Sequence, residues 1–199
     1  MAGRLQPGRR WPLETERIAL EPLEEGHAQE LFHGFQDPRI FQWMPQKPPR
    51  DLGKYSAILR SLESDRSPDG AEAWCNWALR SRETGLIGRA EATIRGKEAW
   101  IACLLFPTAW GQGYAQEAMR AVLDFLFLDQ GVALVHAEVD SRNSPSLNLM
   151  RRLGMACTGV NPFADHFKGH DSHEVQFQLT RRKWEVMRQQ HGPSHLRNR

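Results

Sequence analysis

The sequence predicts a single domain of mixed α/β class, in which a central, mostly antiparallel sheet is flanked by helices. Two observations lead to this prediction. Residues 73–80, 86–94 and 98–106 have the composition of strands and are separated by short polar connections, as successive antiparallel hairpins are. Segments whose apolar residues recur at helical spacing lie before and after this three-strand meander. The length of 199 residues suits one domain with a substantial core.

A strand and two helices are expected before the meander. Apolar and polar residues alternate in 14–23, which indicates a half-buried strand. Helical spacing follows in 24–35 and again in 51–63. Proline, glycine and aspartate in 64–70 then predict a loop that leads into the first strand of the meander.

After the meander, the chain is expected to alternate between helix and strand. Helical spacing begins at Gln116, and residues 132–139 form the next predicted strand. The helix that follows has clear boundaries, because Ser144 suits the N-cap, Pro145 the first helical position and Gly154 the position past the end.

Two closing strands, 156–160 and 174–180, are expected to be joined by a flexible polar loop, 161–173. The loop is rich in histidine and aspartate, and such a cluster invites comparison with metal sites. Its spacing fits no standard zinc motif, so we predict no metal site there.

Both ends of the chain are rich in arginine and polar residues and offer little to bury. We therefore expect flexible tails at 1–12 and 188–199 around a domain that spans 13–187. The sequence leaves open whether the domain is a monomer or a homodimer.

Composition limits the partners and the compartment. A net charge of +2 is too small to indicate a nucleic-acid partner, and no apolar run approaches the roughly 18 residues that a membrane span requires. An odd number of cysteines within apolar runs indicates buried thiols in a reducing compartment, so we expect a cytoplasmic protein. These cysteines are Cys75, Cys103 and Cys157.

The stretch "FPTAWGQGYAQEAM" places Gly111 and Gly113 between the end of a strand and the start of a helix. A helix start presents unpaired backbone N–H groups, and glycines allow an anion to approach them closely. The amides from Gly111 to Gln116 are therefore candidate donors to a diphosphate. A dinucleotide-binding fold is rejected, because Gln116 stands where its fingerprint requires a third glycine.

The run "WGQGYAQEA" resembles the phosphate-binding motif R/Q-x-x-G-x-G/A of the GNAT superfamily of N-acetyltransferases, with the match on Trp110, Gly113 and Ala115. The greatest similarity is to the RimJ/RimL-type branch, in which tryptophan commonly occupies the first position. Further similarities to this branch occur in the same order along residues 14–186. They are "TERIALEPL", "DPRIFQWM", "RETGLIGRA", "NSPSLNLMRRLGM" and "LTRRKW".

The resemblance implies acetyl-CoA as the cofactor and a GNAT-type fold whose fourth and fifth strands, "WIACLLF" and "VALVHAEV", splay apart around the pantetheine arm. It also implies a β-bulge at Leu105 that leaves the Leu105 N–H free to bind the acetyl oxygen. The implied cofactor-binding residues are Leu105, Phe106, Trp110, Gly111, Gln112, Gly113, Tyr114, Ala115, Gln116, Asn143 and Ser146.

The resemblance further implies that Asn143 bonds the pantetheine and that Ser146 lies near the sulfur. Many members of the superfamily carry a tyrosine, thought to be the general acid, where this sequence has Met150. Methionine cannot donate a proton, so we name Ser146 as the candidate acid. Candidate bases are Glu138 and, ranked slightly lower, Glu91, with His136 on the same strand as Glu138 as a further candidate.

The acceptor amine must be neutral when it attacks. An α-amino group with a pKa of about 7.7 to 8.0 meets this condition more easily than a lysine with a pKa of about 10.4. We therefore expect a protein or peptide N-terminus as acceptor, with a small amine as the alternative and a non-catalytic acyl-CoA-binding module as a third hypothesis. Asp165, Asp171 and Glu174 in and beside the last loop, and the segment 41–44, are expected to border the acceptor.

Overall fold

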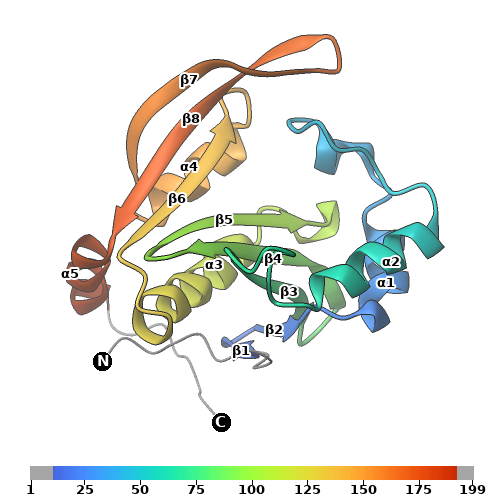
Figure 1. The fold of residues 1–199 in the computed structure, drawn as a ribbon, viewed down its shortest axis with the longest axis horizontal. Helices are drawn as coiled ribbons and strands as arrows, with labels where there is room; N and C mark the ends of the chain where they lie inside the picture. Colours follow the sequence, from blue (N-terminus) through green and yellow to red (C-terminus); the bar gives the residue numbers. More distant parts are fainter. Residues whose placement is uncertain (1–10, 192–199) are drawn as a thin grey trace.

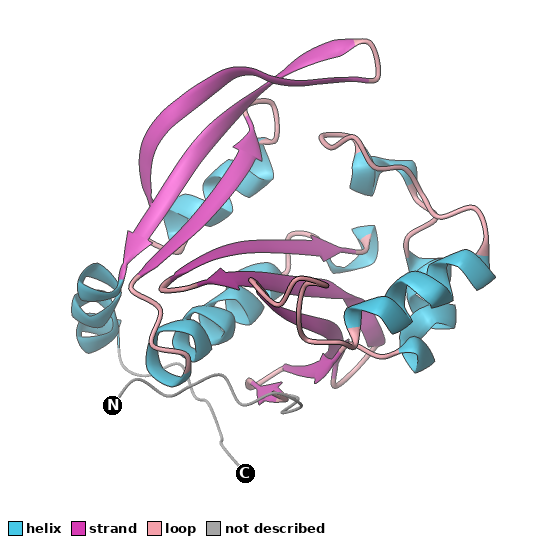
Figure 2. Ribbon diagram, viewed as in Figure 1, coloured by secondary structure: helices cyan, strands magenta, loops and turns pink. Residues whose placement is uncertain are grey.

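The computed structural model describes residues 11–191, which form one sheet with helices on both faces (Figures 1 and 2). Within these residues the strands are β1 (Leu13–Glu14), β2 (Ile18–Pro22), β3 (Ala73–Ser81), β4 (Gly85–Arg95), β5 (Glu98–Leu105), β6 (Leu134–Asp140), β7 (Ala156–Phe167) and β8 (His170–Thr180). The longer helices are α1 (Ala28–Gly34), α2 (Leu52–Leu62), α3 (Tyr114–Asp124), α4 (Ser144–Arg152) and α5 (Arg181–His191). Short helical turns are η1 (Glu25–His27), η2 (Pro38–Phe41), η3 (Pro107–Ala109) and the π-helical η4 (Phe125–Asp129).

The sheet has the order β1-β2-β3-β4-β5-β6-β8-β7, and every neighbouring pair is antiparallel except β5 and β6. The parallel β5–β6 pair joins only Glu98–Leu134, Ala99–Val135 and Trp100–His136 among the described residues. Beyond Trp100 the two strands diverge, so that β1–β5 and β6–β8 form two half-sheets joined at one end (Figure 1). The predicted mixed sheet with two splayed strands is therefore confirmed.

Two apolar clusters hold the helices against the sheet. The larger one lies beneath both half-sheets and contains α3 and α4 side chains such as Met119 and Leu149, together with Trp184 of α5. The smaller one lies on the opposite face and joins α1 and α2 to the β3–β5 region, for example through Leu31 and Leu59. Because the larger cluster spans both half-sheets, they share a core even where their strands are unpaired.

The flexible loop expected at 161–173 is instead the outer part of a long hairpin. β7 and β8 continue pairing through His166–Asp171 and Phe167–His170, so only Lys168 and Gly169 lie outside the strands at the tip. Most side chains of β7 are exposed, because this strand lies at the edge of the sheet. Without a buried face the strand shows no apolar alternation, and the expectation of a loop was wrong for this reason.

The described ends differ from the expected boundaries. Trp11 packs on Phe125 at 5.4 Å between ring centroids, and its carbonyl accepts a hydrogen bond from the Trp77 indole at 2.7 Å. The end of the predicted tail 1–12 is therefore packed against the domain. Helix α5, which was not predicted, continues to His191 and so extends beyond residue 187 into the second predicted tail. Residues 1–10 and 192–199 lie outside the described part of the chain.

Candidate active site

The glycine loop before α3 has the backbone that an anion site requires. Gly111 and Gly113 have φ values of +73° and +82°, in the left-handed region that favours glycine. A side chain at Gly111 would meet no atom within 4 Å, so the conformation rather than crowding calls for glycine there. Gly113 is the N-cap of α3, which begins at Tyr114 rather than at Gln116 as expected. The amides of the first turn lack partners within the helix and point toward an exposed loop, which is the arrangement of a helix N-terminus that can accept an anion.

Arg17, which precedes β2, was not predicted and lies at this glycine loop. Its guanidinium donates to the Gln112 carbonyl at 3.1 Å, pairs with Glu117 at 2.6 Å and lies 4.6 Å from the centre of the Tyr114 ring. These contacts hold the loop against the start of the sheet and place a positive charge beside the amides. No local signal predicts them, because Arg17 and Glu117 are 100 positions apart.

The end of β5 directs one backbone edge toward the diverging β6. The Phe106 amide donates to the Ile87 carbonyl of β4 at 2.8 Å. Because bonding direction alternates along an antiparallel strand, the Leu105 N–H and carbonyl face away from β4, toward the gap between β5 and β6. The Leu105 carbonyl accepts a hydrogen bond from the Trp110 indole at 2.9 Å. Trp110 therefore links the glycine loop to the backbone at Leu105.

The bulge expected at Leu105 is not on β5. The β4–β5 register continues without a shift to Gly88–Leu105, whereas the β3–β4 register shifts and leaves Ile87 of β4 without a partner. Beside this bulge, Gly88 lies so close to β5 that a β-carbon would come within 2.1 Å of the Leu104 carbonyl oxygen. The irregularity therefore lies in the neighbouring strand, which presses directly against the end of β5.

Asn143 and Ser146 lie together at the start of α4. Asn143, not Ser144 as expected, is the N-cap, because its Oδ1 accepts a hydrogen bond from the Ser146 amide at 3.2 Å. The amide N–H groups of the Asn143 side chain are not used in this cap and can serve a ligand. Ser146 is half-buried, and Met150, one turn further along, is buried in the core.

The three candidate bases share one face of the sheet. Neighbours of Glu91 on β4 and of His136 and Glu138 on β6 pack into the core beneath α3, so these three side chains point to the opposite face. His136 is engaged there, because it bonds Glu98 at 2.8 Å and stacks on Trp100 at 4.6 Å between ring centroids. These contacts favour a structural role for His136.

The two glutamates differ in their surroundings. Glu91 forms an ion pair with Arg89 at 3.3 Å. Glu138 is exposed and lies near Glu174 of β8, whose pKa is raised by burial and by the nearby charges of Glu138, Asp165 and Asp140. Glu138 and Glu174 lie on different strands and far apart in the sequence. The β6–β8 register brings them close together and gives this face a negative region.

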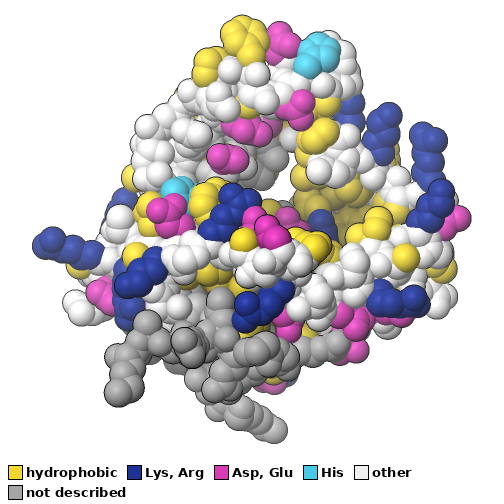
Figure 3. Space-filling view, viewed as in Figure 1, with side chains coloured by type: hydrophobic (Ala, Val, Ile, Leu, Met, Phe, Trp, Pro, Cys, Tyr) yellow, Lys and Arg dark blue, Asp and Glu magenta, His cyan; other side chains and the backbone are white. Residues whose placement is uncertain are grey.

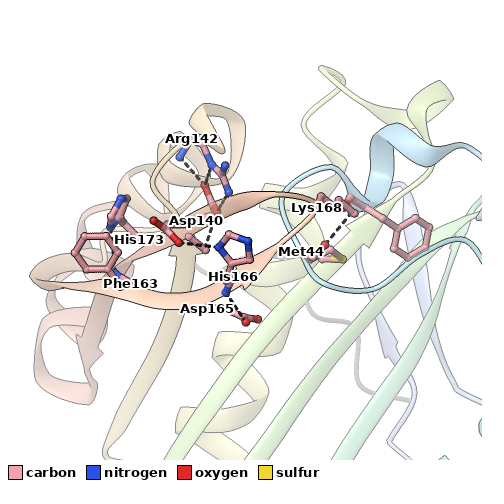
Figure 4. Close-up of polar contacts among 11 residues, drawn as sticks. Met44, Asp140, Arg142, Phe163, Asp165, His166, Lys168 and His173 are labelled. Carbon is pink, nitrogen blue, oxygen red and sulfur yellow. Dashed lines mark hydrogen bonds and ion pairs between the residues drawn. The ribbon is translucent and has the colours of Figure 1, made fainter.

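Two contacts close the far side of the site. Lys168 at the hairpin tip extends toward the segment after η2, and its Nζ donates to backbone carbonyls there, including that of Met44 at 2.9 Å (Figure 4). Arg142 lies over the Trp43 ring of the same segment at 5.0 Å. Figure 3 shows the molecule hollowed between the hairpin and the strands below it, with carboxylate side chains on the hairpin side of the hollow. The hairpin tip is thus in contact with the segment 41–46, which includes the residues 41–44 expected to border the acceptor.

The described residues hold no group of three or more His, Cys, Asp or Glu side chains with the geometry of a metal site. Nor does any described helix combine the length and the apolar character that crossing a bilayer would demand.

Comparison with known proteins gives consistent results. A model of the acetyltransferase (GNAT) domain matches residues 17–156. The chain is similar to the uncharacterized N-acetyltransferase p20 of Bacillus licheniformis, with 26% identity over 176 residues that cover 86% of this chain and 97% of that protein. It is also similar to the uncharacterized protein YkkB of Bacillus subtilis, with 41% identity over 146 residues that cover 72% of this chain and 84% of that protein.

Solved structures share the fold. A GCN5-related N-acetyltransferase from Brucella melitensis has a TM-score of 0.78 and 20% identity, covering 92% of this chain and 85% of that chain. RimJ of Mycobacterium smegmatis, solved in complex with CoA-disulfide, has a TM-score of 0.78 and 16% identity, covering 96% of this chain and 93% of that chain. At these identities the structural matches describe the fold alone.

Proposed function

The chain belongs to the GNAT family of acetyltransferases, and from this premise we propose that its acceptor is the α-amino group at a protein or peptide N-terminus. The activity itself follows from the family: the chain is an acetyl-CoA-dependent N-acetyltransferase. The alternative of a non-catalytic acyl-CoA-binding module is therefore set aside. We also propose membership of the RimJ/RimL-type branch, which Trp110 and the fold similarity to a RimJ support.

The proposed cofactor site depends on one observation, the divergence of β5 from β6 beside the glycine loop. The amides of residues 111–116 would hold the diphosphate, and the side-chain amide of Asn143 would bond the pantetheine between the strands. The Leu105 N–H would then donate to the acetyl oxygen and stabilise the negative charge that develops during attack. A donor of this kind contributes about 2.7 to 4 kcal/mol where one has been removed by mutation. Acetyl-CoA supplies an activated thioester, which the amine attacks directly.

Proton transfer is assigned to two side chains. Glu138 would accept the proton of the amine, directly or through water, because it is exposed on the open face, whereas Glu91 is paired with Arg89. Ser146 would donate a hydrogen bond to the leaving thiolate, since the Met150 side chain offers no donor. We expect Glu138→Gln to lower kcat by about 10²-fold, with a smaller effect for Glu91→Gln. Ser146→Ala with near-normal turnover would remove the role assigned to that hydroxyl.

An α-amino acceptor is favoured because it needs no strong base, and the base proposed on this face is a carboxylate, that of Glu138. An α-amino group with a pKa of about 7.7 to 8.0 is partly neutral at pH 7 and does not need a strong base. A second candidate is a small amine with further positive charges. The negative region around Glu138 and Glu174 favours it, because carboxylates attract such acceptors.

Release of free thiol from acetyl-CoA, measured with a panel of peptides and small amines, tests these assignments. Turnover with peptides that have a free N-terminus, and loss of turnover when that N-terminus is blocked, is the expected result. Turnover confined to small polyamines would overturn the peptide assignment and favour the second candidate. Calorimetry that detects no binding of acetyl-CoA to the folded protein would overturn the cofactor site.

We also propose a cytoplasmic location. All three cysteines are free, as expected in a reducing compartment, although only Cys75 is fully buried and Cys157 is exposed, contrary to the expectation of three buried thiols.

A further inference from the structure

We propose that Lys168 is a latch that closes the acceptor side of the active site, and that acceptors bulkier than a flexible chain end enter only when it is released. Lys168 would thus determine acceptor specificity for the reaction proposed above, on which this inference rests.

The Lys168 ammonium is bound by the chain itself. Its Nζ donates to the backbone carbonyls of Phe41, of Met44 at 2.9 Å and of Gln46 at 3.3 Å. An ammonium has three N–H donors, so these carbonyls satisfy all of them. Burial, with a smaller contribution from Lys47, lowers the pKa of Lys168, which agrees with an ammonium partly withdrawn from water.

A second contact ties the same two segments. Arg142 lies over the Trp43 ring of the segment after η2 at 5.0 Å and over the Phe167 ring of the hairpin at 5.7 Å. Its guanidinium is held in place by the Asp140 carboxylate, with Nη2 to Oδ2 at 2.7 Å. The hairpin tip and the segment therefore meet through a fixed arginine and a terminal lysine. Figure 4 shows Arg142 held by Asp140, and Lys168 bonded to the Met44 carbonyl.

The latch completes a ring around the hollow. The half-sheet β6–β8 and its hairpin form one side, segment 41–46 forms another, and β4 and β5 form the floor (Figures 1 and 3). Glu138 and the backbone edge of Leu105 belong to this region, since both lie where β5 and β6 diverge. An acceptor that approaches from this side therefore passes through the ring, and an extended chain end or a small amine needs less room to do so than the body of a folded protein.

The latch is built in a way that permits release. The Lys168 side chain is exposed apart from its tip, and Met44 and Gln46 lie at the surface or half-buried. Water can therefore replace the ammonium at the Met44 and Gln46 carbonyls, and the carbonyl of the buried Phe41 keeps its hydrogen bond from the Met44 amide at 3.3 Å. The lysine contact, formed by one exposed side chain, is expected to exchange between closed and open states, and removing the side chain shifts that equilibrium although the Arg142 contact remains.

The test compares Lys168→Met with Lys183→Met, which removes the same charge from an exposed position on α5. We expect Lys168→Met to raise kcat/KM for a peptide N-terminus close to a folded domain by about threefold or more relative to a free short peptide. The Kd for acetyl-CoA should not change. Hydrogen exchange in 42–47 and at the hairpin tip should accelerate by about fivefold or more. Lys183→Met should leave all of these measurements at their original values.

Hydrogen exchange tests the latch independently of the proposed acetyltransferase function. Unchanged exchange in 42–47 in both Lys168→Met and Lys168→Gln would overturn the latch, whether or not any amine is acetylated. Accelerated exchange with an unchanged ratio of kcat/KM values would overturn the role in specificity. Accelerated exchange in a protein that acetylates no amine would support the latch and overturn the proposed function instead. Circular dichroism establishes that each variant is folded before these comparisons are made.

Discussion

Asp140 at the end of β6 supports a prediction whose size can be calculated from the structure. The residue is only 6% exposed, and its carboxylate accepts hydrogen bonds from the Arg142 side chain at 2.7 and 2.9 Å and from the Ser172 hydroxyl at 2.7 Å. The Arg142 side chain makes the largest contribution to lowering the pKa of Asp140 from 3.8 to about 2. Asp140→Asn removes the charge and keeps the shape of the side chain.

The sign of the effect follows from the direction of the pKa change. A carboxyl group whose pKa is lower in the folded than in the unfolded protein stabilises the fold above its unfolded value, and loses that contribution as the pH falls toward its folded value. For Asp140 these values are 3.8 and about 2, which correspond to about 2 kcal/mol at pH 7. We therefore expect Asp140→Asn to lower the free energy of unfolding by about 2 kcal/mol at pH 7. The difference from the wild type should shrink below about pH 4 and be nearly lost by about pH 2.

Urea unfolding followed by circular dichroism at several pH values from about 3 to 7 measures this difference, using the linear dependence on urea. Asp171→Asn is the matched control, because Asp171 pairs with His166 on the exposed hairpin, and we expect a change below about 1 kcal/mol. A difference between wild type and Asp140→Asn that is equal at pH 3 and pH 7 would refute the electrostatic reasoning. It would mean that the substitution acts through packing or hydrogen-bond geometry alone.

Three further predictions concern the cofactor site. Gly113→Ala and Gly131→Ala should each lower the free energy of unfolding by about 1 to 2 kcal/mol, because both positions have positive φ. Only Gly113→Ala should also weaken acetyl-CoA binding, by about tenfold in calorimetry. Trp110→Phe removes the hydrogen bond from the indole to the Leu105 carbonyl. It should lower kcat about 2- to 10-fold with little change in the Kd for acetyl-CoA. An unchanged kcat would show that this bond does not orient the backbone at Leu105. Gly88→Ala places a methyl group 2.1 Å from a backbone oxygen of β5 and should lower the melting temperature by about 5 °C or more, and a wild-type melting curve would contradict the close approach of the two strands.

The sequence predicts those structural features that are determined by residues within a few positions of them. The glycine loop and the boundaries of α4 were recognisable, because left-handed glycines, an N-cap and a C-terminal glycine act within a few residues of the feature they define. The N-cap was misplaced by one residue, since Asn143 and Ser144 are both good caps and only the bond to the Ser146 amide distinguishes them.

The parts that were missed depend on distant contacts. Lys168 bonds carbonyls more than 120 positions earlier in the chain, and Arg17 bonds Glu117, 100 positions later. No spacing rule within one segment predicts either contact. The bulge was assigned to the wrong strand for a related reason, because a register shift belongs to a pair of strands, and β4 contributes the extra residue, Ile87.

The divergence of β5 and β6 also affects self-association. Unpaired strand edges normally lie at the rim of a sheet, where they can recruit strands from other molecules. Here two such edges face each other in the interior of the sheet, so that a strand from another molecule does not meet them at the rim. Of the two rim strands, β1 has only two residues, and β7 carries Pro162 and two register shifts, which interrupt the regular edge that a foreign strand would need. The sheet can thus contain two unpaired edges without presenting a template for β-aggregation.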